Sequence, residues 1–133
     1  MRGTFLTGFI FTALVMTACH TTRSSPAVDR HDPEAVLNGY FAAWARNDKN
    51  AQTSFMTSNY ARLANEPLQS LRVLQVTPTD SSSPTTRVYL VSFEVTFSGG
   101  RSLSMENGRY NWTYTLTWDS RRDSWLISSY GAG

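Results

Sequence analysis

The residues able to do chemistry are few in this chain: one cysteine, two histidines and 10 aspartates and glutamates among 133 residues. Cys19 is the most informative of them. A single cysteine excludes an intrachain disulfide, so in an exported protein it is expected to be modified, reactive or paired with another chain. Its position directly after an uncharged apolar stretch favours modification.

The first 18 residues have the layout of an export signal. Arg2 gives a positive start, and residues 3–18 carry no charge, which is typical of a signal peptide and short for the roughly 20 residues of a spanning helix. The segment Leu14-Val15-Met16-Thr17-Ala18-Cys19 resembles the bacterial lipobox, whose cysteine receives diacylglycerol before cleavage. The resemblance implies lipid anchoring through Cys19 on the extracytoplasmic face of the cell membrane. The alternatives are a permanent transmembrane helix and an ordinary secretory leader that leaves a free thiol.

Both histidines, His20 and His31, lie in the polar stretch that follows. Residues 19–31 are rich in Thr, Ser, Arg and Asp and show no helical or strand period, which predicts a flexible tether of about 20 Å average length. We interpret the two histidines as solvated tether residues rather than metal ligands. No cysteine pair, helically spaced histidines or acidic triplet indicates a metal site, and no cofactor is expected.

An acid–base site would depend on a carboxylate, because residues 32–133, the expected folded domain, contain no histidine. Glu94 is the best catalytic candidate, since it is the acidic residue that lies inside a strong strand pattern. Its alternation with Ser92 and Thr96 favours instead a solvated face and a cross-strand partner such as Arg109. No Ser-His-Asp or Cys-His set and no Gly-rich phosphate loop accompanies Glu94.

A set of large aromatic residues either lines an apolar ligand pocket or forms the core, which is the commoner role. Two members lie at helical spacing in residues 33–46, and the others fall on alternate positions of residues 87–98 and 107–118. They are Tyr40, Trp44, Phe93, Phe97, Trp112 and Tyr114.

Helices are expected in the first half of the domain. Asp32-Pro33-Glu34 is a strong helix start, because Asp32 can cap and Pro33 fits the first helical position. Val36, Leu37, Tyr40, Phe41 and Trp44 continue it at helical spacing to about Arg46. Gly39 inside this helix suggests a close approach to another element. Two shorter helices are predicted over residues 50–56 and 58–64.

Four strands are expected in the second half. Strict alternation of aromatic or aliphatic with polar residues over 87–98 and 107–118 predicts long, half-buried antiparallel strands. A first strand over 68–77 is predicted to carry Leu71 and Val73 on one side and Leu74 and Val76 on the other. A last strand covers 125–130. The predicted fold class is α+β, with N-terminal helices packed on a curved, cone-like, four-stranded antiparallel sheet.

This order of elements, with the hairpin residues Tyr110-Asn111-Trp112-Thr113-Tyr114 and the late Trp125-Leu126-Ile127, resembles the nuclear transport factor 2-like, or cystatin-like, cone superfamily. More narrowly, the chain is similar to small Gram-positive lipoproteins of that superfamily. The resemblance covers about residues 32–133. It implies a conical pocket beneath helices and a homodimer through the sheet, and its members include isomerases, dehydratases and binding modules, so it does not fix a function.

The net charge of the chain and the distribution of its arginines bear on the kind of partner that it binds. The formal charge of +2 falls to +1 when Arg2 leaves with the leader, and the arginines are scattered, which argues against nucleic-acid binding. The leading hypothesis is a non-enzymatic, membrane-anchored domain of the cell envelope that binds a protein partner. The alternatives are an isomerase- or dehydratase-like enzyme with a carboxylate in the cone, and a carrier of a small apolar ligand.

Overall fold

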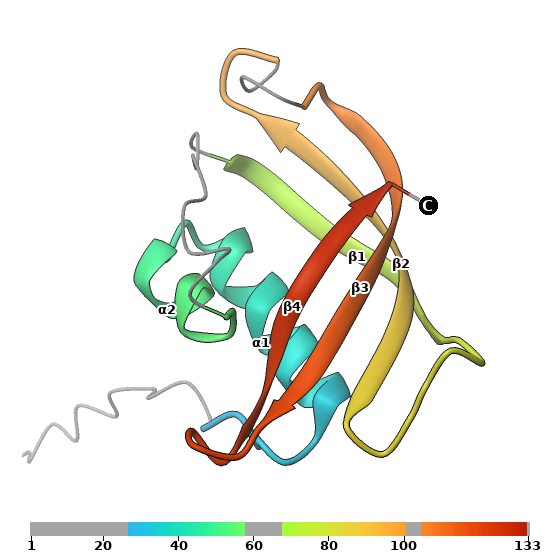
Figure 1. The fold of residues 1–133 in the computed structure, drawn as a ribbon. Helices are drawn as coiled ribbons and strands as arrows, with labels where there is room; N and C mark the ends of the chain where they lie inside the picture. The colour runs from blue at the N-terminus through green and yellow to red at the C-terminus, as the bar shows by residue number, and fades with distance from the viewer. Residues whose placement is uncertain (1–26, 58–67, 101–104, 133) are drawn as a thin grey trace, which may run out of the picture.

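The computed structural model describes residues 27–57, 68–100 and 105–132, which form two helices and one four-stranded sheet. Helix α1 (Pro33–Ala45) and helix α2 (Lys49–Ser54) precede the strands. The strands are β1 (Leu68–Pro78), β2 (Thr86–Phe97), β3 (Gly108–Asp119) and β4 (Ser124–Ala132). They pair antiparallel in chain order, β1-β2-β3-β4. The predicted α+β fold class is therefore confirmed: the sheet curves around α1, which lies against its inner face (Figure 1).

The ends of α1 follow the local chemistry expected from the sequence. The carboxylate of Asp32 accepts a hydrogen bond from the backbone N–H of Glu34 at 3.0 Å, and Pro33 opens the helix. After the helix, Asn47 takes a positive φ of 57°, and its side-chain amide bonds both backbone groups of Leu68, at 2.8 and 3.1 Å. This pair of bonds fixes the start of β1 beside the end of α1.

Helix α2 is shorter than the helix predicted over 50–56. Its first turn is capped by Asp48, whose carboxylate accepts from the backbone N–H of Ala51. The chain then leaves the helix and pairs with the free edge of β4: the N–H of Ile127 donates to the carbonyl of Phe55, and the N–H of Thr57 donates to that of Ile127. Edge pairing thus replaces the last helical turn. The helix predicted over 58–64 lies outside the described residues.

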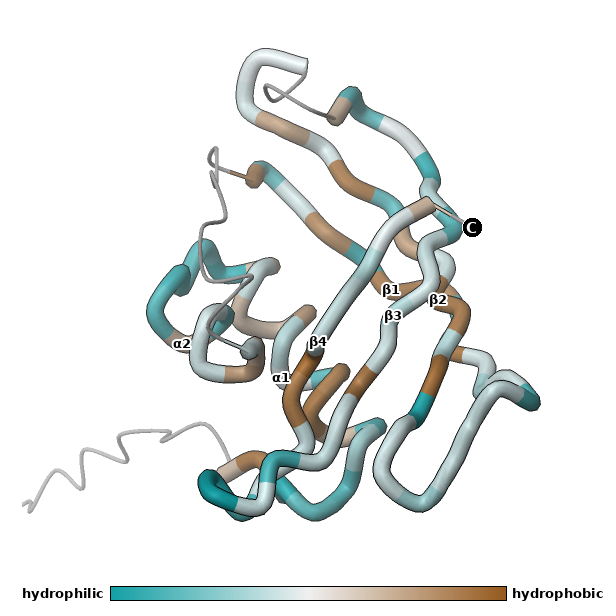
Figure 2. The backbone as a smooth tube through the Cα atoms, viewed as in Figure 1, coloured by the Kyte–Doolittle hydropathy of each residue, from teal (hydrophilic) through white to brown (hydrophobic). Residues whose placement is uncertain are grey.

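The core lies between α1 and the inner face of the sheet. Val36, Leu37, Tyr40 and Phe41 of the helix are at most 2% exposed. The strands contribute alternate residues, and Figure 2 shows apolar stretches on α1 and on the sheet. The strand residues in the core are Leu68, Tyr89, Val91, Phe93, Val95, Phe97, Tyr114, Leu116, Trp125 and Ile127.

One prediction about β1 was wrong. Leu71, Val73 and Val76 all pack against the core, whereas Leu74 is 37% exposed. The cause is a bulge: Val73 pairs with Phe93 and Gln75 with Ser92, so Leu74 is an extra residue in the strand. An extra residue shifts the alternation by one position, and Val76 is turned to the inner side.

Candidate functional site

The aromatic set predicted as either pocket or core packs together between α1 and the sheet. Tyr40, Trp44, Phe93, Phe97 and Tyr114 are each at most 8% exposed, and Trp112 is half-buried. The ring centroids of Tyr40 and Tyr114 are 5.8 Å apart, and those of Trp44 and Phe93 are 5.7 Å apart. Such distances are typical of aromatic pairs in contact. These rings fill the inner side of the sheet.

Two tyrosine hydroxyls lie inside this aromatic packing. Burial raises the pKa of Tyr40, and a hydrogen bond with the side chain of Gln52, which is itself buried, opposes that rise. Burial also raises the pKa of Tyr114 well above its ordinary value, helped by Tyr40 and Tyr130 nearby. Both phenols therefore stay protonated. Within the described residues the Tyr114 hydroxyl makes no hydrogen bond of strict geometry, but the Tyr40 side chain is close enough to act on its pKa as a hydrogen-bond partner.

A stacked row of rings continues from Tyr114 toward the end of β4. Tyr130 stacks on Tyr114 with centroids 5.7 Å apart and planes at 20°, and on its other side it stacks on Trp112 at 5.7 Å and 19°. Tyr130 and Trp112 are half-buried. The row joins the interior to a partly open aromatic surface, which is the type of surface that apolar ligands contact.

Glu94, the candidate catalytic residue, lies on the opposite face of the sheet. Its neighbours Phe93 and Val95 point into the core, so Glu94 points outward. One carboxylate oxygen is 3.5 Å from the Arg72 guanidinium and 3.6 Å from that of Arg109, and the side chain is 43% exposed. The expected cross-strand contact with Arg109 is present. This position is that of a surface ion pair and does not fit a carboxylate enclosed in the cone.

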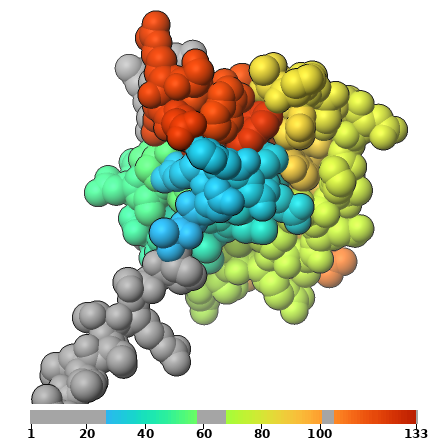
Figure 3. All heavy atoms as spheres, turned by 90° about the horizontal axis from the view of Figure 1, so that it is seen from below, coloured from blue at the N-terminus to red at the C-terminus, as the bar shows by residue number. Residues whose placement is uncertain are grey.

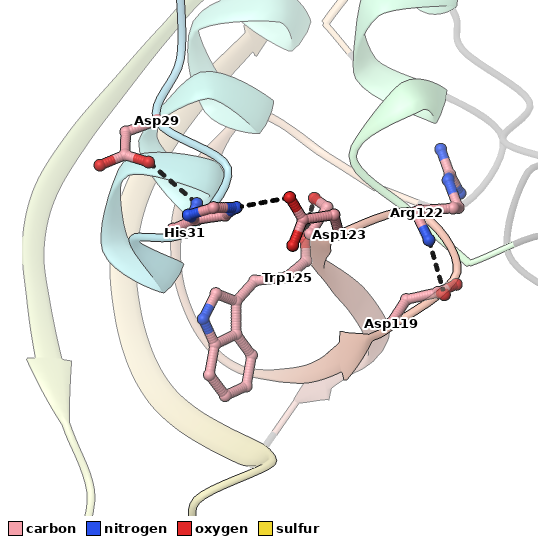
Figure 4. Close-up of polar contacts among 7 residues, drawn as sticks. Asp29, His31, Asp119, Arg122, Asp123 and Trp125 are labelled. Carbon is pink, nitrogen blue, oxygen red and sulfur yellow. Dashed lines mark hydrogen bonds and ion pairs between the residues drawn. The ribbon is translucent and has the colours of Figure 1, made fainter.

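The segment before α1 docks on the turn between β3 and β4. Nε2 of His31 lies 2.9 Å from Oδ2 of Asp123, and Asp29 accepts from the backbone N–H of His31 (Figure 4). The His31 ring also meets the ring of Trp118 at 5.6 Å. The hydrogen bond to Asp123, followed by its negative charge, raises the pKa of His31. His31 is therefore an exposed contact residue rather than a free tether residue.

Arg30 extends this docking. Its carbonyl accepts from the backbone N–H of Trp125 at 3.0 Å, and its guanidinium lies 4.2 Å above the Phe55 ring. Seen from below, the atoms of this segment lie against those of the β3–β4 end (Figure 3). The contacts of the folded domain thus begin before Asp32. The sequence predicted the boundary between tether and domain at Asp32. The composition of residues 27–31 gave no sign of this, because the partners are distant in sequence.

Cys19, His20 and the predicted signal peptide lie outside the described residues. Neither described helix has the length and apolar character that crossing a membrane requires. In the same part of the chain, no group of three His, Cys, Asp or Glu side chains is arranged to hold a metal ion.

Comparison with known proteins gives structural neighbours only. The sequence matches no protein-family model and no curated protein. A Δ5-3-ketosteroid isomerase from Mycobacterium sp. has a TM-score of 0.46 at 15% identity, covering 72% of this chain and 89% of that one. A protein assigned as a polyketide cyclase from Xanthomonas campestris pv. campestris has 0.42 at 12%, covering 75% and 91%. A computationally designed 17-OHP binder has 0.42 at 8%, covering 76% and 98%.

Proposed function

We propose that this protein is a lipid-anchored component of the cell envelope whose single domain, a nuclear transport factor 2-like cone, binds a protein partner through the outer face of its sheet. The observation that carries the proposal is the contrast between the two faces of β2. Tyr89, Val91 and Phe93 are at most 6% exposed inside, whereas Leu90 outside is 40% exposed. The side that is left available for recognition is the outer one.

The outer face has a small apolar centre. Leu74 and Leu90 are the two exposed large hydrophobic residues in the described part of the chain. Leu90 pairs with Thr77 and Thr113, and Leu74 sits in the bulge opposite Ser92, two residues further along β2. Both leucines therefore belong to one patch of the outer face. Hydroxyl-bearing residues surround them.

The chemistry of this face suits a protein surface better than a nucleic acid or an anionic bilayer. An apolar centre with a polar rim is the usual anatomy of protein interfaces. The charges beside it nearly cancel, because Arg72 and Arg109 share the carboxylate of Glu94 and leave a single net positive charge. A face of this kind offers no basic stripe for phosphates. We take the partner to be another envelope protein, held within reach because the anchor confines the domain to the membrane surface.

A crosslinking experiment tests the proposed surface. A photoreactive amino acid replaces Leu90 in the full chain, and Asn50, an exposed residue of α2, is replaced in the matched control. After irradiation of intact cells we expect a discrete protein adduct from position 90 and none from position 50. An adduct with a second copy of this chain would make the partner the protein itself. Equal labelling from both positions, or none from position 90, contradicts the proposal.

One observation favours a second function, carriage of a small apolar ligand. The buried hydroxyl of Tyr114 has the Tyr40 side chain as its close polar neighbour but no hydrogen bond of strict geometry within the described residues, and a ligand acceptor atom would satisfy it more fully. The stacked rings of Tyr130 and Trp112 offer an apolar approach to it. Quenching of tryptophan fluorescence by an apolar ketone, lost in Tyr114→Phe, would support carriage. Identical quenching in both proteins would argue against it.

A further inference from the structure

Two arginines from distant parts of the chain converge on one carbonyl group. Arg30 lies before α1, and Arg122 lies in the turn between β3 and β4. Nη1 of Arg30 donates to the Ser54 carbonyl at 3.0 Å, and Nη2 of Arg122 donates to the same oxygen at 3.1 Å. Sharing one acceptor holds the two guanidinium groups side by side at the end of α2.

The two positive charges form no contact with a carboxylate of residues 27–57, 68–100 or 105–132. The nearby acids are otherwise engaged: Asp119 accepts from the backbone N–H groups of Arg121 and Arg122, and Asp123 bonds His31. Figure 4 shows the Arg122 side chain directed away from Asp119. Burial, and then the charge of Arg122, lower the pKa of Arg30.

A cavity of about 150 Å³ lies at this junction, lined by Arg30, Ser54, Arg122 and Ser124. The hydrogen bonds of Arg30 and Arg122 to the protein use only some of their guanidinium N–H donors. A guanidinium has five N–H donors. Arg30 directs two bonds at Ser54, and Arg122 directs one at Ser54 and one at Met56. The remaining N–H groups of the two guanidiniums can therefore serve a ligand, whereas the Ser54 hydroxyl already donates to the carbonyl of Ala51 at 2.6 Å.

We propose that this cavity is an oxyanion site that binds a phosphate group, with Arg30 and Arg122 as its charged donors. Paired guanidinium forks match the geometry of tetrahedral oxyanions and bind them through charge-assisted hydrogen bonds. A bound anion also removes the repulsion between the two arginines. The site is accessible, since Arg122 is exposed.

The phosphate has two sources with the same chemistry. Under the proposed function, the chain between Cys19 and Arg30 spans at most about 40 Å, so the phosphate of a lipid headgroup is within reach of the cavity. Free phosphate or a soluble phosphate ester is the other source. The site itself is a property of the folded domain, and it stands even if Cys19 carries no lipid.

The test uses the full chain in uncharged maltoside micelles, with NMR of the arginine Nε–H groups. One arm adds inorganic phosphate, and the other adds phosphatidylglycerol to the micelles. We expect the Nε–H signals of Arg30 and Arg122 to shift with saturation while that of Arg121 stays. Because charged hydrogen bonds contribute about 1.5–3 kcal/mol, Arg122→Gln should weaken binding at least about tenfold. Arg121→Gln, with the same change of charge one residue away, should weaken it less than about twofold.

The two probes distinguish the two sources of phosphate. Saturation by inorganic phosphate identifies a soluble ligand, and saturation by phosphatidylglycerol alone identifies a lipid headgroup; both support the site. If neither probe shifts Arg30 and Arg122 more than Arg121, or if the two glutamine variants weaken binding equally, the proposal is wrong. Should Arg122→Gln fail to fold, Arg122→Lys keeps the charge without the fork and is expected to show an intermediate loss.

Discussion

His31 and Asp123 lie 92 residues apart in the chain, yet their side chains meet at 2.9 Å. This contact joins the segment before α1 to the turn between β3 and β4. Together with the backbone bond from Trp125 to Arg30, it makes residues 27–31 part of the domain. The predicted lipid tether would therefore end on a fixed point at one end of the sheet.

The contact predicts a pH dependence. Because Asp123 raises the pKa of His31 above its ordinary value of 6.5, folding is favoured by protonation of this residue. The stabilisation is fully present below pH 6.5 and is lost as pH rises through the raised pKa of the folded state. Asp123→Asn should remove this dependence and return the pKa of His31, followed by NMR, toward 6.5. The control is Asp80→Asn in an exposed loop. An unchanged pKa in Asp123→Asn would contradict the contact.

Gly39 is predicted to resist substitution. A Cβ at this position would lie 2.8 Å from the Phe55 ring and 2.9 Å from Cγ2 of Val28. Overpacking costs about 1–3 kcal/mol and exceeds the roughly 1 kcal/mol that alanine contributes to a helix. Gly39→Ala should lower the free energy of unfolding in urea, and adding Val28→Ala should recover part of the loss. Gly131→Ala, where a Cβ meets nothing within 4 Å, should not destabilise. A neutral Gly39→Ala would contradict the close approach.

Tyr114→Phe is predicted to keep or increase stability in the absence of ligand. The mutation removes a buried hydroxyl whose contact with the Tyr40 side chain falls short of strict hydrogen-bond geometry, and a buried hydroxyl left without its hydrogen bond costs about 1–3 kcal/mol. Tyr110→Phe is the matched control. Its hydroxyl donates to the carbonyl of Glu106 at 2.8 Å and accepts from the N–H of the same residue at 3.0 Å, so about 1 kcal/mol should be lost. A large loss in Tyr114→Phe would show that the hydroxyl is bonded in the folded protein.

Mutations of Glu94 and Phe93, which are adjacent on β2, should differ strongly in their effect on the free energy of unfolding. Glu94→Gln removes an exposed ion pair and should change the free energy of unfolding by less than about 1 kcal/mol. Phe93→Ala empties a fully buried position and should lose about 3–5 kcal/mol. Urea denaturation of both variants measures the difference. A comparable loss in Glu94→Gln would mean that the carboxylate is buried in a role that its exposed position does not indicate.

The sequence predicted the features that depend on local chemistry. Asp32 and Pro33 determine the start of α1, and the period-two alternation around Phe93 and Tyr114 identifies β2, β3 and their inner face. These signals lie within a few neighbouring residues, because capping and side-chain alternation are properties of a single helix or strand.

Other features depend on how distant segments meet, and no local pattern carries them. The bulge at Leu74 arises from the register of β1 with Ser92 and Phe93. Because of the bulge, Val76 faces the core rather than the side that the alternation in the sequence predicts. The pairing of Arg30 with Arg122 depends on the docking of the segment before α1. In sequence, Arg30 lies in the predicted tether and Arg122 follows Arg121, so nothing links the two positions.

The proposed lipid anchor is tested most directly by the mass of the N-terminal peptide of the mature protein purified from its native membrane. We expect the mature chain to begin at Cys19 and this residue to carry a thioether-linked diacylglycerol. We also expect that Cys19→Ala yields no lipidated peptide. A mature chain that begins at Cys19 with a free thiol, or one that retains residues 1–18, would contradict the proposed lipid anchor.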